Sequence, residues 1–212
     1  MDLRPWIADE RRRVAALIET LTPEQLATPS LCGAWTVHDV AAHLLMPLVT
    51  PMSKVMIMMI AGGLDVDKAN VKLTASVARR SAREIADGLR RGADHRFKPP
   101  GMDYEAPLND LLVHQGDLRR PLGLAADLDP ERVRVCLDFA VNGPGSSRGR
   151  GKAFEGLRLE ATDLDWSHGS GPPVLRGTGE ALLMARNGRP QALADLDGDG
   201  AELLRSRLRQ RA

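Results

Sequence analysis

A break in the sequence pattern at Asn142–Lys152 most constrains what this chain can fold into. The segment reads NGPGSSRGRGK, and its Gly, Ser and Arg content is typical of a linker. Before this segment, apolar residues recur at helical spacing. Directly after it, apolar and polar residues alternate. The 212 residues suffice for one large domain or two small ones. We therefore predict a helical domain over residues 1–141, a linker over 142–152 and a small α+β domain over 153–212.

Helix-start signals recur through the first part of the chain. Thr22 is followed by Pro23 and Gln25, and Thr36 is followed three residues later by Asp39, both patterns of a capping box. Short loops between successive helices favour an antiparallel bundle. The sequence predicts helices over residues 6–21, 36–61 with a bend at Pro47 or Pro51, 66–92, 104–120 and 130–141.

The part that follows the linker has a mixed pattern. Leu157, Leu159 and Ala161 alternate with polar residues, which indicates a strand. The segment SHGSGPP is predicted to be a turn. A second strand is expected in VLRGTG, and helices in GEALLMARNG and AELLRSRLRQ. The predicted fold class is α+β, mainly α: a helical bundle followed by a small α/β domain.

The amino-acid composition limits which kinds of binding partner and which cellular compartment we expect. The chain has 29 basic and 28 acidic residues, a balance that does not favour nucleic-acid binding. Its two cysteines, Cys32 and Cys136, form no CxxC pair, which favours a reducing compartment. The most apolar run, residues 40–63, is interrupted by His43, Lys54 and two prolines and lacks the ~20 clean apolar residues of a membrane span. We expect a cytoplasmic protein that binds neither nucleic acid nor membrane.

Three polar residues are candidate metal ligands. His43 lies on the second predicted helix, and Asp110 and His114 lie four residues apart on the fourth, with leucines on either side. Two imidazoles and a carboxylate from facing helices form a three-ligand set that leaves a position open, as in catalytic zinc sites. Two alternatives remain open. A single histidine on an apolar helix face, such as His43, is more often a core or boundary residue than a ligand. Asp110 and His114 are also explained as a helix-surface pair worth ~0.2–0.5 kcal/mol.

Two stretches carry a resemblance to a known family. LTPEQLATPSLCGAWTVHDVAAHLL and DLLVHQGDLRRPLG resemble signatures of the DinB-like, mycothiol-dependent maleylpyruvate isomerase family. The C-terminal part is similar to that family's small module, which is sometimes likened to sterol-carrier domains. The resemblance implies a DinB-like four-helix bundle in the first domain. The matching positions are Trp35, Thr36, Val37 and His43 in the first stretch, and Asp110, His114, Asp117 and Gly123 in the second.

The resemblance also implies a metal site. It implies a divalent metal, usually zinc, on His43, Asp110 and His114. Asp110 stands where the family usually has Glu, so its reach is shorter by one methylene. Asp117 would then hold a ligating imidazole in its tautomer. The alternative for Asp117 is a helix cap or a salt bridge with a neighbouring arginine.

The implied chemistry uses a small thiol. Mycothiol would attack a small electrophilic substrate, giving isomerisation or thiol S-transfer. Arg80, Arg83 and Arg189 are candidates for binding a substrate carboxylate, although each is also explained as a surface arginine. Two other classes remain open: a mononuclear non-haem iron enzyme, and a non-catalytic ligand-binding or stress protein on the same bundle. The sequence indicates no catalytic side chain, substrate identity or oligomeric state.

Overall fold

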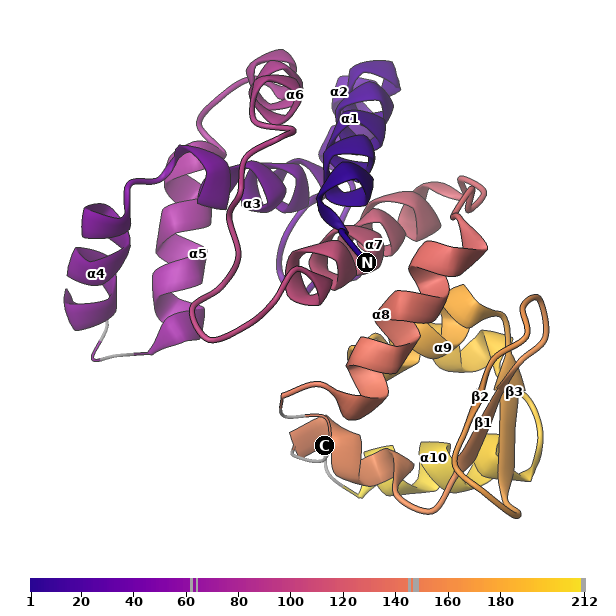
Figure 1. Ribbon diagram of the computed structural model, residues 1–212. Helices are drawn as coiled ribbons and strands as arrows, with labels where there is room; N and C mark the ends of the chain where they lie inside the picture. The colour runs from indigo at the N-terminus through magenta and orange to yellow at the C-terminus, as the bar shows by residue number, and fades with distance from the viewer. Residues whose placement is uncertain (62, 64, 145, 147–148, 211–212) are drawn as a thin grey trace. The chain divides into compact units, whose positions relative to one another are not determined.

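The computed structural model describes residues 1–61, 63, 65–144, 146 and 149–210, and its fold is α+β, mainly α. Packing divides the chain into two compact units (Figure 1). Unit 1 comprises Met1–Pro99 and Asp117–Ala125, and unit 2 comprises Pro100–Gly116 and Ala126–Ala212. Helix α7 (Glu105–Arg119) runs through this division as one helix, so its first three turns belong to unit 2 and its end to unit 1.

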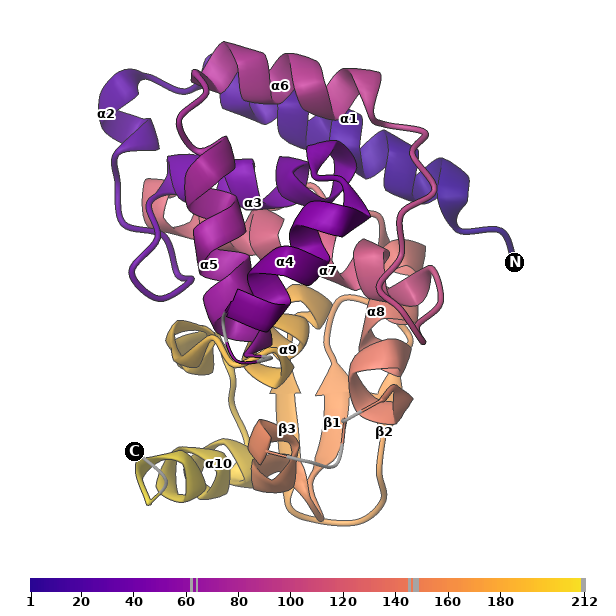
Figure 2. The same cartoon turned by 90° about the vertical axis from the view of Figure 1, so that its left-hand side faces the viewer.

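Unit 1 is built from helices alone within its described residues. Helix α6 packs along α1 and also against α3, which in turn packs on α5 (Figure 2). Gly88 of α6 permits the close approach to α3, because a Cβ there would lie 2.8 Å from a terminal methyl of Leu45. The elements of unit 1 are α1 (Arg4–Thr20), α2 (Pro23–Leu26), α3 (Val37–Val49), α4 (Met52–Ala61), α5 (Val66–Val77), α6 (Ala82–Arg91), the end of α7 and the 3-10 helix η1 (Arg120–Leu122).

The local start signals are confirmed, but two predicted helices are each divided. Thr22 and Thr36 both form full capping boxes. The helix predicted over 36–61 is α3 and α4, separated at Thr50 and Pro51. The helix predicted over 66–92 is α5 and α6, because Ser81 starts a new helix with a capping box of its own. Gly62, expected to help end α4, lies outside the described residues.

Unit 2 combines a three-stranded sheet with helices. Strand β1 (Arg158–Ala161) is central, antiparallel to β2 (Ser167–His168) and parallel to β3 (Val174–Gly177). Helices α9 and α10 pack on one face of this sheet (Figure 1). The other elements are α8 (Pro130–Asn142), η2 (Gly149–Phe154), α9 (Gly179–Arg186), η3 (Pro190–Asp195) and α10 (Asp199–Arg209).

The strand predicted after the linker is confirmed as β1. Leu159 and the preceding Leu157 are buried as the alternation predicts, whereas Ala161 is only half-buried. The turn predicted over residues 167–173 is wrong in part, because it begins with β2. Helix α8, expected with the bundle, packs against α9 inside unit 2. The division by packing therefore differs from the predicted boundary at residue 142, and η2 begins within the segment predicted as a linker; residues 145 and 147–148 of that segment lie outside the described residues.

Across the described residues, no helix is both long enough and apolar enough to cross a membrane.

Candidate metal centre

Helix α7 brings two of the predicted ligands together. Asp110 and His114 lie one turn apart, and Asp110 Oδ1 is 3.4 Å from His114 Nε2. The residue exposure of His114 is only 6%, whereas 47% of the Asp110 side chain is exposed. The burial follows from the apolar residues of the same helix, since Leu111 and Leu118 are both buried. On α7, a buried imidazole therefore lies beside a partly exposed carboxylate.

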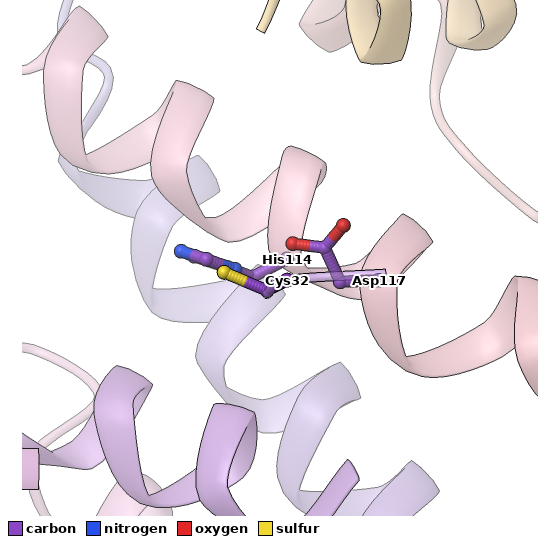
Figure 3. Close-up of side chains that lie close together, drawn as sticks. All are labelled: Cys32, His114 and Asp117. Atoms are coloured by element: carbon purple, nitrogen blue, oxygen red, sulfur yellow. The ribbon is translucent and has the colours of Figure 1, made fainter. Parts of the chain in front are cut away.

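Asp117 follows on the same helix and is fully buried. Its carboxylate lies within 4.8 Å of the His114 imidazole and, inside unit 1, within 4.8 Å of Cys32 Sγ (Figure 3). Its backbone carbonyl accepts a hydrogen bond from Leu31 N at 3.4 Å. The end of α7 is therefore anchored to the loop that carries Cys32.

That loop is closed by its own hydrogen bonds. The Ser30 hydroxyl donates to the carbonyl of Trp35 at 2.7 Å and accepts from Cys32 N at 3.1 Å. Val37 N donates to Thr28 O at 2.9 Å, which fixes the start of α3 to the start of the loop. The loop thereby holds the Trp35 side chain against the first turns of α3.

His43, on α3, belongs to unit 1. Its ring centroid is 5.1 Å from that of Trp35, with the two planes tilted by 39°. Its Nδ1 is 3.4 Å from the hydroxyl of Thr74, on α5. The residue is half-buried. The His43 ring is thus held from two sides. That it shares a metal ion with Asp110 and His114 stays a prediction.

The three predicted substrate arginines are divided between the two units. Arg80 and Arg83 belong to unit 1 and Arg189 to unit 2. Arg83 is exposed on α6, near Glu19. Arg189 donates to the carbonyl of Asn187 at 2.7 Å. Arg80 lines a surface cavity of unit 1.

Sequence reasoning missed two residues beside these groups. No motif marks Cys32 as part of a site, yet its thiol lies within 4.8 Å of the buried carboxylate of Asp117. Thr74, whose hydroxyl lies 3.4 Å from His43 Nδ1, belongs to no sequence motif. Both contacts join residues far apart in the chain, so no local spacing could have indicated them.

Known proteins resemble the chain over most of its length. The model of the family described as "Mycothiol maleylpyruvate isomerase N-terminal domain" matches residues 7–135. Uncharacterised proteins from two strains of Mycobacterium tuberculosis are each 26% identical over 171 residues, which covers 71% of this chain and 85% of theirs. The crystal structure of the mycothiol-dependent maleylpyruvate isomerase superposes with a TM-score of 0.51 at 15% identity, covering 86% of this chain and 89% of that one.

The structural likeness shows the fold, and the family model covers more than half of the chain. The chain belongs to the mycothiol maleylpyruvate isomerase N-terminal domain family.

Proposed function

We propose that this protein is a metal-dependent enzyme that uses a low-molecular-weight thiol, with the metal held by His43, Asp110 and His114. The observation that carries the proposal is the 3.4 Å separation between Asp110 Oδ1 and His114 Nε2. Two ligand atoms bound to one tetrahedral zinc ion at ~2.1 Å lie ~3.4 Å apart. The two donors on α7 therefore already have the spacing of two zinc ligands.

A chain of contacts supports His43 as the third ligand. The His43 ring packs on Trp35, whose loop contacts Asp117 through Leu31. All of these contacts lie within unit 1. Asp117 in turn is one turn from His114 on the continuous helix α7. Thr74 at Nδ1 of His43 favours Nε2 as the ligating nitrogen, because the partner of one ring nitrogen selects the role of the other.

The departure from the family's usual Glu does not make the acid too short. The Asp110 carboxylate already comes within 3.4 Å of the imidazole with which it would share an ion. Its partial exposure also leaves one side of the pair accessible to small molecules. Asp110 therefore fits the role of the carboxylate ligand.

A bound zinc ion would lower the pKa of a thiol and so supply a thiolate at neutral pH. In the isomerisation, the sulfur would add to the carbon–carbon double bond of an enone, forming a C–S bond and moving the electron pair to the enolate oxygen. Rotation about the resulting single bond and reversal of the addition would release the thiolate and the isomer. The step is redox-neutral and needs no other reactant. Burial of His114 and Asp117 keeps water from the imidazole side of the site.

Mycothiol as the thiol, and maleylpyruvate as the first substrate to test, are supported by the family to which the chain belongs and by the isomerase whose fold it shares. The test is an isomerisation assay with purified protein, mycothiol and maleylpyruvate. We expect turnover that requires both the thiol and the protein and that is lost in His114→Ala. His168→Ala, a change at a half-buried histidine on β2, is the matched control and should retain activity. Turnover that persists in His114→Ala, or no thiol-dependent reaction with any enone tested, would contradict the proposal.

A further inference from the structure

Unit 1 carries a cavity that contains none of the proposed metal ligands. It has a volume of about 450 Å³, within the range of pockets that bind small molecules. Residues 80, 84, 88, 91 and 92 line it along α6 and its flanks, and Leu48 and Val49 at the end of α3 line it from the other side. It is therefore an elongated groove beside one helix, with an apolar middle.

The floor of the groove is apolar and partly open to solvent. Val49 is 37% exposed, unusual for a valine that follows buried residues of the same helix. Gly92 has no side chain to fill the space, and a Cβ there would lie 3.1 Å from a methyl of Leu48. The groove thus presents apolar surface that a ligand could cover.

The two ends of the groove differ in charge. At one end Arg80 lies near Glu84, whose pKa is lowered chiefly by hydrogen bonds from Ser81 and also by this arginine. At the other end are Arg91 and His95, with no acidic residue among the lining residues near them. Among the described residues, the Arg91 guanidinium makes no hydrogen bond or ion pair. Its charge is therefore not neutralised by the chain itself.

A buried cation, Arg11, also lies at that end, and its charge is partly offset by Asp94, which itself pairs with Arg12. Arg11 Nη1 donates to the backbone carbonyls of Gly92, Ala93 and His95, at 3.3, 2.8 and 2.7 Å. Burial lowers the pKa of Arg11 to about 10, so it is charged at neutral pH. Three backbone carbonyls directly after α6 are thereby occupied.

From this arrangement we propose that the groove binds a small amphipathic carboxylate. The carboxylate lies at Arg91 and His95, and the apolar body lies over Val49, Leu48 and Gly88. Charge-assisted hydrogen bonds to a guanidinium favour an anion there, and the apolar floor selects against anions that have no hydrocarbon body. The site uses none of the proposed metal ligands, so it does not depend on the proposed function.

The test is a titration of ¹⁵N-labelled protein with octanoate, followed by amide chemical shifts. We expect saturable shifts at Gly88, Gly92 and His95. Octanol has the hydrocarbon tail without the charge, and acetate has the charge without the tail. Each should bind at least about tenfold more weakly than octanoate. Arg91→Gln should weaken octanoate binding about tenfold. Arg79→Gln removes the same charge from a residue that does not line the groove and should leave binding unchanged.

A second variant tests the apolar contact with the ligand at a residue whose change should not affect folding. Val49→Asn changes an exposed side chain and should weaken octanoate severalfold while leaving acetate unaffected. Equal octanoate affinities in Arg91→Gln and Arg79→Gln would overturn the proposal, as would shifts confined to other parts of the chain. Octanoate binding should also persist in His114→Ala, so failure of the isomerisation assay leaves this inference intact.

Discussion

On helix α7, Asp110 Oδ1 lies 3.4 Å from His114 Nε2, so a half-exposed carboxylate meets a buried imidazole one turn away. An ordinary helix-surface pair of this kind contributes only ~0.2–0.5 kcal/mol and does not require a buried histidine. A metal ion shared by the two side chains, as proposed above, would account for the 3.4 Å spacing. The variants below distinguish these two explanations.

The acid at position 110 tests the metal explanation. We expect Asp110→Asn to weaken zinc binding by at least about tenfold, because it removes the anionic ligand and leaves a similar shape. Asp110→Glu should retain zinc binding, since it keeps an anionic carboxylate at this position. Competition with a fluorescent zinc chelator measures both. If the Asn variant binds zinc as tightly as the wild-type protein, Asp110 is no ligand.

Asp117 is expected to position the imidazole rather than to bind metal. Its carboxylate is fully buried within 4.8 Å of the His114 ring. Asp117→Asn should lower zinc affinity by about 10–100-fold, the usual effect of removing a partner of a ligating histidine. It should also change the pH dependence of zinc binding, because the imidazole loses the carboxylate that favours its tautomer. A purely structural role predicts lower stability with an unchanged pH dependence.

A glycine fixes the packing of α10 on the sheet of unit 2. A Cβ on Gly200 would lie 2.7 Å from Val174 C and 2.8 Å from Leu175 N, and backbone atoms cannot move aside as a side chain can. Gly200→Ala should therefore lower the free energy of unfolding by about 2 kcal/mol or more. Urea denaturation measures the change, with Glu202→Ala, an exposed substitution on the same helix, as the control. Equal stability of the two variants would show that α10 does not pack on β3 at this distance.

The start of α6 gives a prediction about pH. Hydrogen bonds from Ser81 lower the pKa of Glu84 from its usual value near 4.5. A carboxyl whose pKa is lowered by folding adds stability above its usual pKa, and this is lost as the pH falls through the lowered value. Ser81→Ala should lower the Tm by about 2–4 °C at pH 7, and the difference from wild type should shrink below pH 4.5.

Thermal unfolding followed by circular dichroism checks this prediction, with Ser81→Thr as the variant that keeps the cap. A difference that stays constant from pH 7 to pH 3 would mean that the Glu84 carboxylate does not contribute to the cap.

The sequence predicted best what local physics determines. Thr22 and Thr36 start their helices as predicted, because a capping box needs only residues three apart. Ser81 and Glu84 carry the same signal, but helical spacing on both sides of Ser81 favoured one uninterrupted helix. Strand β2 has only two residues, too few for an alternating pattern.

The candidate site was predictable only in part. Asp110 and His114 could be paired from the sequence because four residues span one turn of a helix. The proximity of Cys32 to Asp117 and the contact of Thr74 with His43 depend on packing between segments distant in the chain. No periodicity encodes such contacts, so they required the folded structure.

The most direct test of the proposed metal centre is elemental analysis of purified protein by mass spectrometry, for the wild type and for His43→Ala, His114→Ala and His168→Ala. We predict about one zinc ion per chain in the wild type and in His168→Ala. Occupancy should be largely lost in His43→Ala and His114→Ala, with circular dichroism confirming that both are folded. Iron in place of zinc would keep the ligands and change the class of enzyme. Full occupancy in the folded His43→Ala and His114→Ala variants would contradict the account.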